Sequence, residues 1–266
     1  MKLENAVRAT TLKKFSTGIN DIILAAKNCL YLFMYKACSL ISLKLSLIFL
    51  TQDLVSNRVI YVKVRDLYLY LTESISSDQP LLEWQNLFNN SFVKDGSWDK
   101  NVRLIVPHYY NQHHKRAISY RSTFQLFKEK INYVDCDEYQ SKIKGSNGFA
   151  KMTESELNER YEKLKSIYQS IKSDGYKSQK DLNAKPCHWK DEIKVVLDRK
   201  GKPIKLAQSA NHRFAIAQIL NIEYVPVYVL AIHEGWLLEI CKQHNSEPLL
   251  AIKKHFDNIN SVYEKK

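Results

Sequence analysis

The sequence predicts an α+β (mixed α/β) fold, and three local patterns support this prediction. Apolar and polar residues alternate over residues 193–197 and again over 204–206, with a Lys-Gly-Lys turn between them, which is typical of a hairpin. Residues 153–171 carry apolar side chains at helical spacing, and residues 224–229 again resemble a strand. Helices and strands are therefore both expected in the core.

The N-terminal part is expected to be mostly helical. Residues 22–50 are rich in Ile, Leu, Ala and Phe, but Lys27, Lys36 and Lys44 interrupt the run. No charge-free stretch reaches the roughly 18 to 20 residues that a membrane-spanning helix needs, and the segment does not fit a signal peptide. We expect two buried helices that break near Lys36, with peripheral attachment to an anionic membrane as the alternative.

The elements that follow are predicted in chain order. A strand is expected at residues 58–64, residues 66–71 either continue it or begin a helix, and residues 83–94 fit either structure. Helical spacing covers residues 117–131. Residues 153–156 read Thr-Glu-Ser-Glu, a capping box that begins a helix. The apolar face of this helix consists of Leu157, Tyr161, Leu164, Ile167 and Ile171.

The clearest loop, Lys144-Gly145-Ser146-Asn147-Gly148, predicts the domain boundary. We expect an N-terminal helical and accessory region over residues 1–148, a second domain over 149–240, and a basic C-terminal tail over 241–266.

Composition indicates a globular chain without a disulfide framework. Of the 266 residues, 45% are hydrophobic, and there are only 7 Gly and 6 Pro, which argues against a disordered protein. The cysteines are odd in number and irregularly spaced, at Cys29, Cys38, Cys136, Cys187 and Cys241. This pattern predicts free thiols and a cytoplasmic location, and the Cys and His spacing matches no recognised zinc motif.

The segment after the hairpin carries the main functional signal. We expect Asn211 or Ser209 to cap a helix that ends at Asn221, a residue that tolerates the left-handed conformation. His212 and Arg213 fall in the first turn, where the helix dipole disfavours positive charge. A bound anion would reverse this effect, because unpaired amides together with Arg and His donors form a phosphate site. The alternative is that both are ordinary surface side chains.

Several motifs around this segment resemble the ParB/sulfiredoxin-like domain over roughly residues 153–235, with an insertion at about 180–191. In chain order they are Ser166-Ile167, Gly175-Tyr176, Ile193 to Asp198, Gly201, Ala210 to Ala217, Asn221-Ile222 and Val225-Pro226-Val227. Branches of that superfamily hydrolyse CTP on DNA-bound dimers, repair an oxidised cysteine with ATP, or phosphorylate free serine. The resemblance implies that nucleotide phosphates bind at the box that here reads Ala210-Asn211-His212-Arg213.

Three departures from the family pattern limit what the resemblance implies. Asn211 stands where sulfiredoxin activity requires a cysteine, so we do not expect that chemistry. Ala210 replaces the usual glycine, at a position where the backbone approaches the phosphate and the conformation favours glycine. About 30 residues follow Trp236, too few for the helix-turn-helix domain of the ParB branch, so a partition-type DNA clamp is disfavoured.

A second resemblance is to a group of ParB-like proteins that share "GxWD", "GY..Q" and "H..W" elements. The matching segments are residues 95–99, 175–179 and 233–236. This resemblance implies that the upstream region belongs with the nucleotide domain. The simpler interpretation of Trp98 and Trp236 is that both are buried at a domain contact.

The resemblance implies a nucleotide-phosphate-binding protein that acts as an ATP-dependent small-molecule phosphotransferase or a nucleotide hydrolase. ATP or another NTP, with Mg²⁺, would be the cofactor, and a small hydroxyl compound the phosphoacceptor. Arg213 and His212 would be the catalytic clamp on the transferring phosphates, and Ser209, Ala210 and Asn211 would complete the binding site.

Asp198, Glu234 and His233 are candidates for a general base because they follow strand ends. The alternative class is a non-catalytic protein with a degenerate nucleotide site, which binds nucleic acid or a membrane surface through its net charge of +12. Residues 107–116 are rich in His, Tyr, Lys and Arg, and either stack on bases or form a polar loop that faces the nucleotide pocket.

Overall fold

The computed structural model describes residues 58–71, 92–113, 115–182, 191–206 and 209–264. Residues Thr51–Lys266 form one compact unit. The two helices predicted within residues 22–50, Gln208 and most of the segment 83–94 lie outside the described residues.

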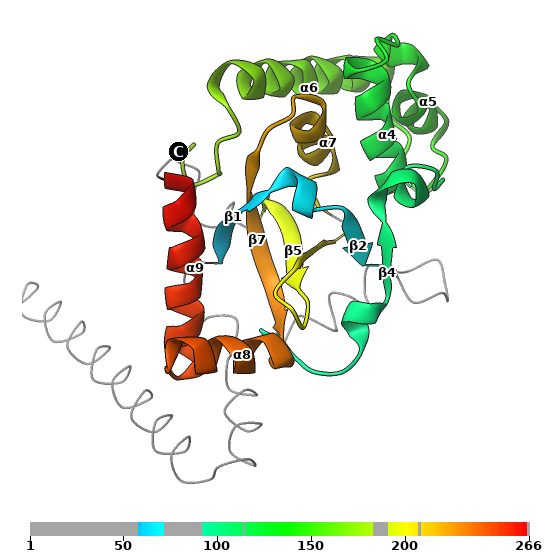
Figure 1. The fold of residues 1–266 in the computed structure, drawn as a ribbon. Helices are drawn as coiled ribbons and strands as arrows, with labels where there is room; N and C mark the ends of the chain where they lie inside the picture. Colours follow the sequence, from blue (N-terminus) through cyan, green and yellow to red (C-terminus); the bar gives the residue numbers. More distant parts are fainter. Residues whose placement is uncertain (1–57, 72–91, 114, 183–190, 207–208, 265–266) are drawn as a thin grey trace, which may run out of the picture. The chain divides into compact units, whose positions relative to one another are not determined.

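The fold is α+β, as predicted, and it is built on one mixed sheet (Figure 1). The described strands are β1 (Val59–Lys63), β2 (Leu69–Leu71), β3 (Val93–Lys94), β4 (Val102–Leu104), β5 (Ile193–Leu197), β6 (Pro203–Lys205) and β7 (Tyr224–His233). They are arranged in the order β1-β7-β5-β6-β2-β4, and β3 pairs with β7 beside this path.

The described α-helices are α4 (Lys115–Phe127), α5 (Asp137–Lys144), α6 (Glu154–Asp174), α7 (Asn211–Ile219), α8 (Glu234–His244) and α9 (Pro248–Glu264). Shorter helical turns are η1 (Val64–Asp66), η2 (Trp98–Lys100), η3 (Ile105–Tyr109) and η4 (Tyr133–Asp135). α7 packs most extensively against α4 and also contacts α6, which places it inside a helical layer.

The predicted hairpin is confirmed as β5 and β6, which are antiparallel with Val195 opposite Lys205. Asp198 closes its turn, because one carboxylate oxygen accepts the backbone N–H groups of Lys200 and Lys202 at 2.8 Å each. β5 also pairs in parallel with β7. β5 is therefore an interior strand of the sheet, and most of its side chains are buried.

The sheet core is an apolar cluster contributed by several strands and one 3₁₀ turn. Its buried members are Leu71, Trp98, Val196, Ile204, Leu206 and Ala231. Trp98 is 8% and Trp236 5% exposed, which confirms that both tryptophans are buried. Each Å² of apolar surface that is buried contributes about 25 cal/mol to stability, so such clusters are the main stabilising element of the sheet.

The two ends of the sheet carry different polar groups. β6 ends beside the start of β5, so the chain leaves the sheet there and begins α7. The turn between β5 and β6 lies at the opposite end, together with His233, where β7 continues into α8 (Figure 1). Asp99 holds Arg199 at this second end, with Nη2 to Oδ1 at 2.5 Å.

Several predicted helix boundaries agree with the structure. The capping box at Thr153 and Glu156 begins α6. Asn221 is left-handed, with φ +53°, after the last turn of α7, and Ile222 N–H donates to Ala217 O across that turn. The helix predicted over 117–131 instead spans 115–127, because the backbone turns out of the helix at Lys130, where φ is +62°.

The sequence-predicted divisions differ from the observed arrangement. The described part of residues 1–148 contributes β1, β2, β3 and β4 as well as helices, and these strands share a sheet with β5, β6 and β7 across the predicted boundary at 148. Residues 66–71 neither continue β1 nor form a helix throughout, since η1 is followed by the separate strand β2.

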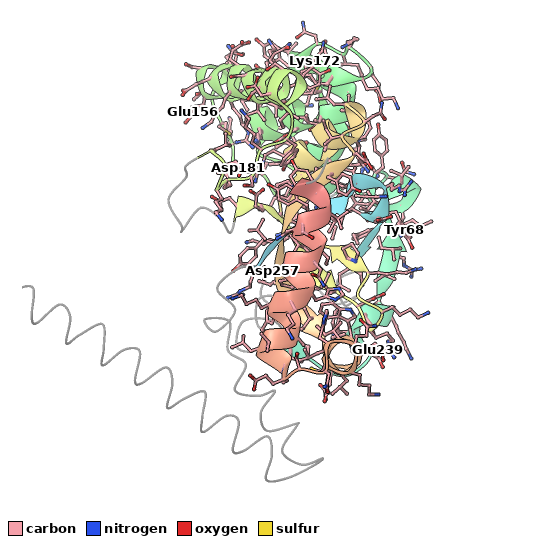
Figure 2. The ribbon with its side chains drawn as sticks, turned by 60° about the vertical axis from the view of Figure 1, so that its left-hand side comes forward. Tyr68, Glu156, Lys172, Asp181, Glu239 and Asp257 are labelled. Carbon is pink, nitrogen blue, oxygen red and sulfur yellow. The ribbon has the colours of Figure 1, made fainter. Side chains whose placement is uncertain are left out.

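The predicted basic tail, residues 241–266, contains the end of α8 and all of α9. Ala251, Ile252 and Phe256 bury one face of α9, while Asp257 lies on its solvent side (Figure 2). Asn260 of α9 accepts the backbone N–H of Tyr61 and donates to Val59 O, each at 3.1 Å. α9 therefore protects the edge strand β1, whose backbone groups would otherwise be open to another strand.

Candidate functional site

The helix α7 begins in an unusual backbone conformation. Ala210 is its N-cap, with φ +47° and ψ +38°, and it provides no side-chain cap. The first backbone bond of the helix runs from Phe214 N–H to Ala210 O at 2.9 Å. The left-handed region disfavours residues with a Cβ by about 1–2 kcal/mol. The prediction that position 210 requires a glycine-like conformation is confirmed, whereas the prediction that Ser209 or Asn211 caps α7 is wrong.

The side chains of Ser209 and Asn211 are buried and bond to β5 and β6 instead of capping α7. Ser209 Oγ accepts the backbone N–H of Lys194 at 2.7 Å, which fixes the turn to the start of β5. Asn211 Oδ1 accepts Lys205 Nζ at 2.7 Å. Both side chains are thus used to shape the turn, and of the two only Asn211 also lines the adjacent cavity.

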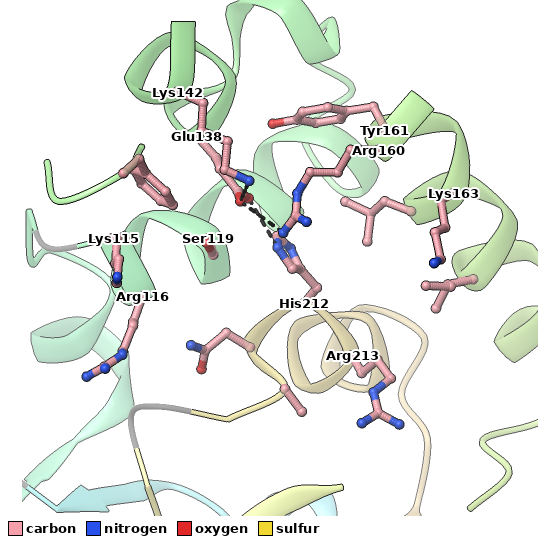
Figure 3. A pocket seen from close by; sticks show the side chains of 15 residues that line it. Lys115, Arg116, Ser119, Glu138, Lys142, Arg160, Tyr161, Lys163, His212 and Arg213 are labelled. Carbon is pink, nitrogen blue, oxygen red and sulfur yellow. Dashed lines mark ion pairs between the residues drawn. The ribbon is translucent and has the colours of Figure 1, made fainter. Parts of the chain in front are cut away.

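A cavity of about 650 Å³ lies at the N-terminal end of α7, which we call the opening of that helix (Figure 3). It is formed by side chains of α4, α5, α6 and α7 together with the segments before α6 and α7. The lining residues are Lys115, Arg116, Ser119, Glu138, Lys142, Phe149, Arg160, Tyr161, Lys163, Leu164, Ile167, Ala210, Asn211, His212 and Arg213.

The lining is strongly cationic. Among the described residues, six lysine or arginine side chains and one histidine line the cavity together with a single carboxylate, Glu138. Glu138 is 1% exposed. Lys142, Arg160 and His212 converge on it (Figure 3), with Lys142 Nζ 2.7 Å and Arg160 Nη2 3.6 Å from Oε1. The carboxylate is already paired, so the cavity keeps a surplus of positive charge.

The buried charges of this cluster stabilise each other. Burial alone would raise the pKa of Glu138, but the charges and hydrogen bonds of His212 and Lys142 outweigh it and hold the pKa well below its usual range. Burial lowers the pKa of Lys142 against the attraction of Glu138. Glu138 is therefore ionised at neutral pH and unsuited to accept a proton from a substrate.

His212 is held on both sides of its ring. Nε2 lies 3.2 Å from Glu138 Oε2, and Nδ1 lies 3.0 Å from Thr123 Oγ1. Thr123 Oγ1 also donates to Ser119 O at 2.8 Å. The two ring contacts therefore fix the orientation of His212 between α4 and α5.

Arg213 also lines the cavity but already has protein partners. Its Nη1 lies 3.4 Å from Glu192 Oε2, and its Nη2 donates to Asp191 O. The guanidinium lies 6.0 Å from the ring centre of Tyr176, in the "GY..Q" element. Burial raises the pKa of Glu192, although the Gln179 N–H and Arg213 act in the opposite direction.

The exposed cations of the cavity were not among the predicted site residues. They are Lys115 on α4, and Arg160 and Lys163 on α6. A signal for Lys115 existed, because it and Arg116 end the stretch 107–116, which is rich in basic and aromatic residues. A signal for α6 also existed, since Arg160 and Lys163 flank the predicted apolar face at helical spacing.

The three general-base candidates lie away from the cavity lining. Asp198 closes the hairpin turn. His233 Nδ1 accepts Gly235 N–H at 2.9 Å as the cap of α8, and Glu234 begins that helix. His233 Nε2 is 3.0 Å from Gly96 O, so the "GxWD" and "H..W" elements meet at the opposite end of the sheet.

The described residues contain no cluster of three or more His, Cys, Asp or Glu side chains that would hold a metal ion. Within the described ranges, no helix has the length and apolar character to cross a membrane. No protein-family model, no curated protein and no solved structure matches this chain.

Proposed function

We propose that the cavity at the opening of α7 binds the phosphate groups of a nucleoside triphosphate. The observation that carries the proposal is the charge of the lining, in which six lysine or arginine side chains accompany one carboxylate that is already paired. A ligand with several negative charges relieves the repulsion among these groups. The volume of about 650 Å³ suits a ligand of nucleotide size.

The cations surround the place where phosphates would bind. Lys115 and Arg116 come from α4, and Arg160 and Lys163 come from α6. The first backbone bond of α7 is donated by Phe214, so the amides before it have no acceptor within the helix. These amides and the helix dipole favour a bound anion. Phe149 adds an apolar surface to the lining for a nucleobase. His212 and Arg213 also line the cavity, where they remain bonded to Glu138 and Glu192.

The described lining does not fit a protein-held Mg²⁺, because its one carboxylate is engaged by Lys142 and His212. The resemblance to the ParB/sulfiredoxin-like domain supports phosphotransfer to a small hydroxyl compound, or nucleotide hydrolysis, as the activity. In either reaction the cations would stabilise negative charge on the phosphoryl group.

The test is a thermal-unfolding screen of the full chain with ATP, GTP, CTP and tripolyphosphate. A ligand at ~100 times its dissociation constant adds about 2.7 kcal/mol to the free energy of unfolding, which raises the melting temperature by several degrees. Stabilisation by a nucleotide supports the proposal, and stabilisation by tripolyphosphate alone restricts it to the phosphate groups. If none of them acts and single-stranded RNA binds in a salt-sensitive manner, the nucleic-acid alternative replaces it.

A further inference from the structure

Lys205, at the end of β6, is a buried lysine directly beneath the opening of α7. Its side chain is 1% exposed. Nζ donates to Leu206 O at 3.0 Å, to Ser209 O at 3.0 Å and to Asn211 Oδ1 at 2.7 Å. Among the described residues, no carboxylate forms an ion pair with it. The ammonium is therefore held by backbone and amide oxygens of the turn alone.

The geometry of these bonds fixes the residue that opens the helix. An ammonium group has three N–H donors, and the three oxygens use all of them. Two of the acceptors belong to Ser209 and Asn211, on either side of Ala210. By restraining both neighbours, Lys205 restrains the left-handed conformation of Ala210, which an alanine does not favour by itself.

We propose that Lys205 is a positioning residue, which holds Leu206, Ser209 and Asn211 in the positions that direct the first turn of α7 into the cavity. The inference rests on the proposed function, because it assigns Lys205 to the phosphate site without placing it in contact with the ligand. Lys205 is not among the residues that line the cavity. Its effect on binding passes through Ala210, Asn211 and the first turn of α7.

The charge of Lys205 makes this restraint sensitive to pH. Burial lowers the pKa of Lys205 to about 7, and the charge of Arg116 on α4 acts in the same direction. The α7 residues next to the ammonium are Asn211 and Phe214, and the centre of the Phe214 ring is 5.4 Å from Nζ. A neutral amine has two donors for three acceptors. The restraint on the turn therefore weakens as the pH rises through neutrality.

The experiment compares tripolyphosphate binding to the full-length wild type, Lys205→Met and Lys202→Met by calorimetry at about pH 6 and about pH 8.5. Lys202 is exposed on the hairpin turn at the opposite end of the sheet, so its variant removes the same charge without touching the cavity. We expect Lys205→Met to bind about tenfold more weakly than the wild type at pH 6, with a smaller difference at pH 8.5. Lys202→Met should follow the wild type at both pH values.

Hydrogen exchange of the ligand-free proteins gives a second readout. Amides of residues 209–214 should exchange faster in Lys205→Met than in the wild type, while those of β5 remain unchanged. Equal binding by a folded Lys205→Met and the wild type overturns the inference and leaves the proposed function intact. If the wild type itself does not bind tripolyphosphate, the proposed function fails, and the exchange of residues 209–214 alone decides whether Lys205 positions the turn.

Discussion

Glu138 Oε2 lies 3.2 Å from His212 Nε2, so one buried carboxylate on α5 holds the first turn of α7. The same carboxylate contacts Lys142 on its own helix and Arg160 on α6. Three helices are therefore joined at a single ionised group. This arrangement collects cations around the cavity and compensates only part of their charge, which is the condition for an anion site.

Glu138→Gln should destabilise the protein. The substitution leaves Lys142, which is 5% exposed, without its ionic partner. Removing one member of a buried pair lowers the free energy of unfolding by about 3 kcal/mol or more. Urea unfolding at pH 7 measures the change, with Glu159→Gln as a control, because Glu159 is an exposed carboxylate on α6. A loss of less than 1 kcal/mol for Glu138→Gln would contradict the buried pairing.

The stability that Glu138 provides should disappear in acid. Its pKa is depressed in the folded state, so its contribution is complete above the unfolded value of about 4.3 and is lost as the pH falls toward the folded value. The difference in unfolding free energy between the wild type and Glu138→Gln should accordingly be largest near pH 6 and shrink below about pH 4. A difference that stays constant from about pH 6 to pH 3 would exclude this assignment.

Ala210→Gly should stabilise the protein, although glycine usually has the opposite effect. Ala210 has φ +47°, which glycine adopts without steric strain. We expect a gain of about 0.5–1 kcal/mol in the free energy of unfolding. Ala217→Gly is the matched control, since Ala217 lies in the interior of the same helix. This variant should lower the free energy of unfolding by about 1 kcal/mol. Destabilisation by both variants would show that Ala210 is not left-handed in solution.

Local sequence patterns were sufficient to predict the hairpin, α6 and the end of α7. Each of these elements is defined by residues near in sequence, such as the Thr153 capping box or the left-handed Asn221. The basic composition of residues 241–266 predicts a tail, whereas α9 buries a face that includes Ile252 and Phe256. These apolar residues recur at helical spacing, and that spacing is the signal for this helix.

The candidate site depends on contacts that are distant in sequence. The box containing His212 was predicted, but its partner Glu138 lies on α5 and its neighbour Lys115 lies on α4. No local pattern joins these three positions. The alternation over residues 204–206 predicts a strand but not the burial of Lys205, which follows from α7 folding back over the end of β6.

Gly201→Ala should test the contact between the hairpin turn and α8. A Cβ on Gly201 would overlap the indole of Trp236, within 2.7 Å of Cδ1. Gly148→Ala is the matched control, because the two glycines have φ values of +75° and +76° while a Cβ on Gly148 meets only Lys115 Cδ at 3.9 Å. We expect Gly201→Ala to lose about 2 kcal/mol more than the control. Equal losses in urea unfolding would refute the close approach.

Lys115→Ala and Lys163→Ala should each weaken binding of a nucleoside triphosphate or tripolyphosphate. Both side chains are exposed at the cavity, from different helices, so each removes one cation without disturbing a buried pair. We expect about a threefold to tenfold rise in the dissociation constant for either variant, and a smaller effect when salt screens the remaining charges. Calorimetry at about 0.05 M and about 0.5 M NaCl measures both quantities.

Lys172→Ala provides the control for those variants, because Lys172 is an exposed cation on α6 outside the cavity lining (Figure 2). It changes the net charge equally but should leave the dissociation constant unchanged. If all three variants weaken binding to the same extent, the anion responds to the overall charge of the protein rather than to the cavity. If Lys115→Ala and Lys163→Ala alone act, the cations of α4 and α6 bind the same ligand across the opening of α7.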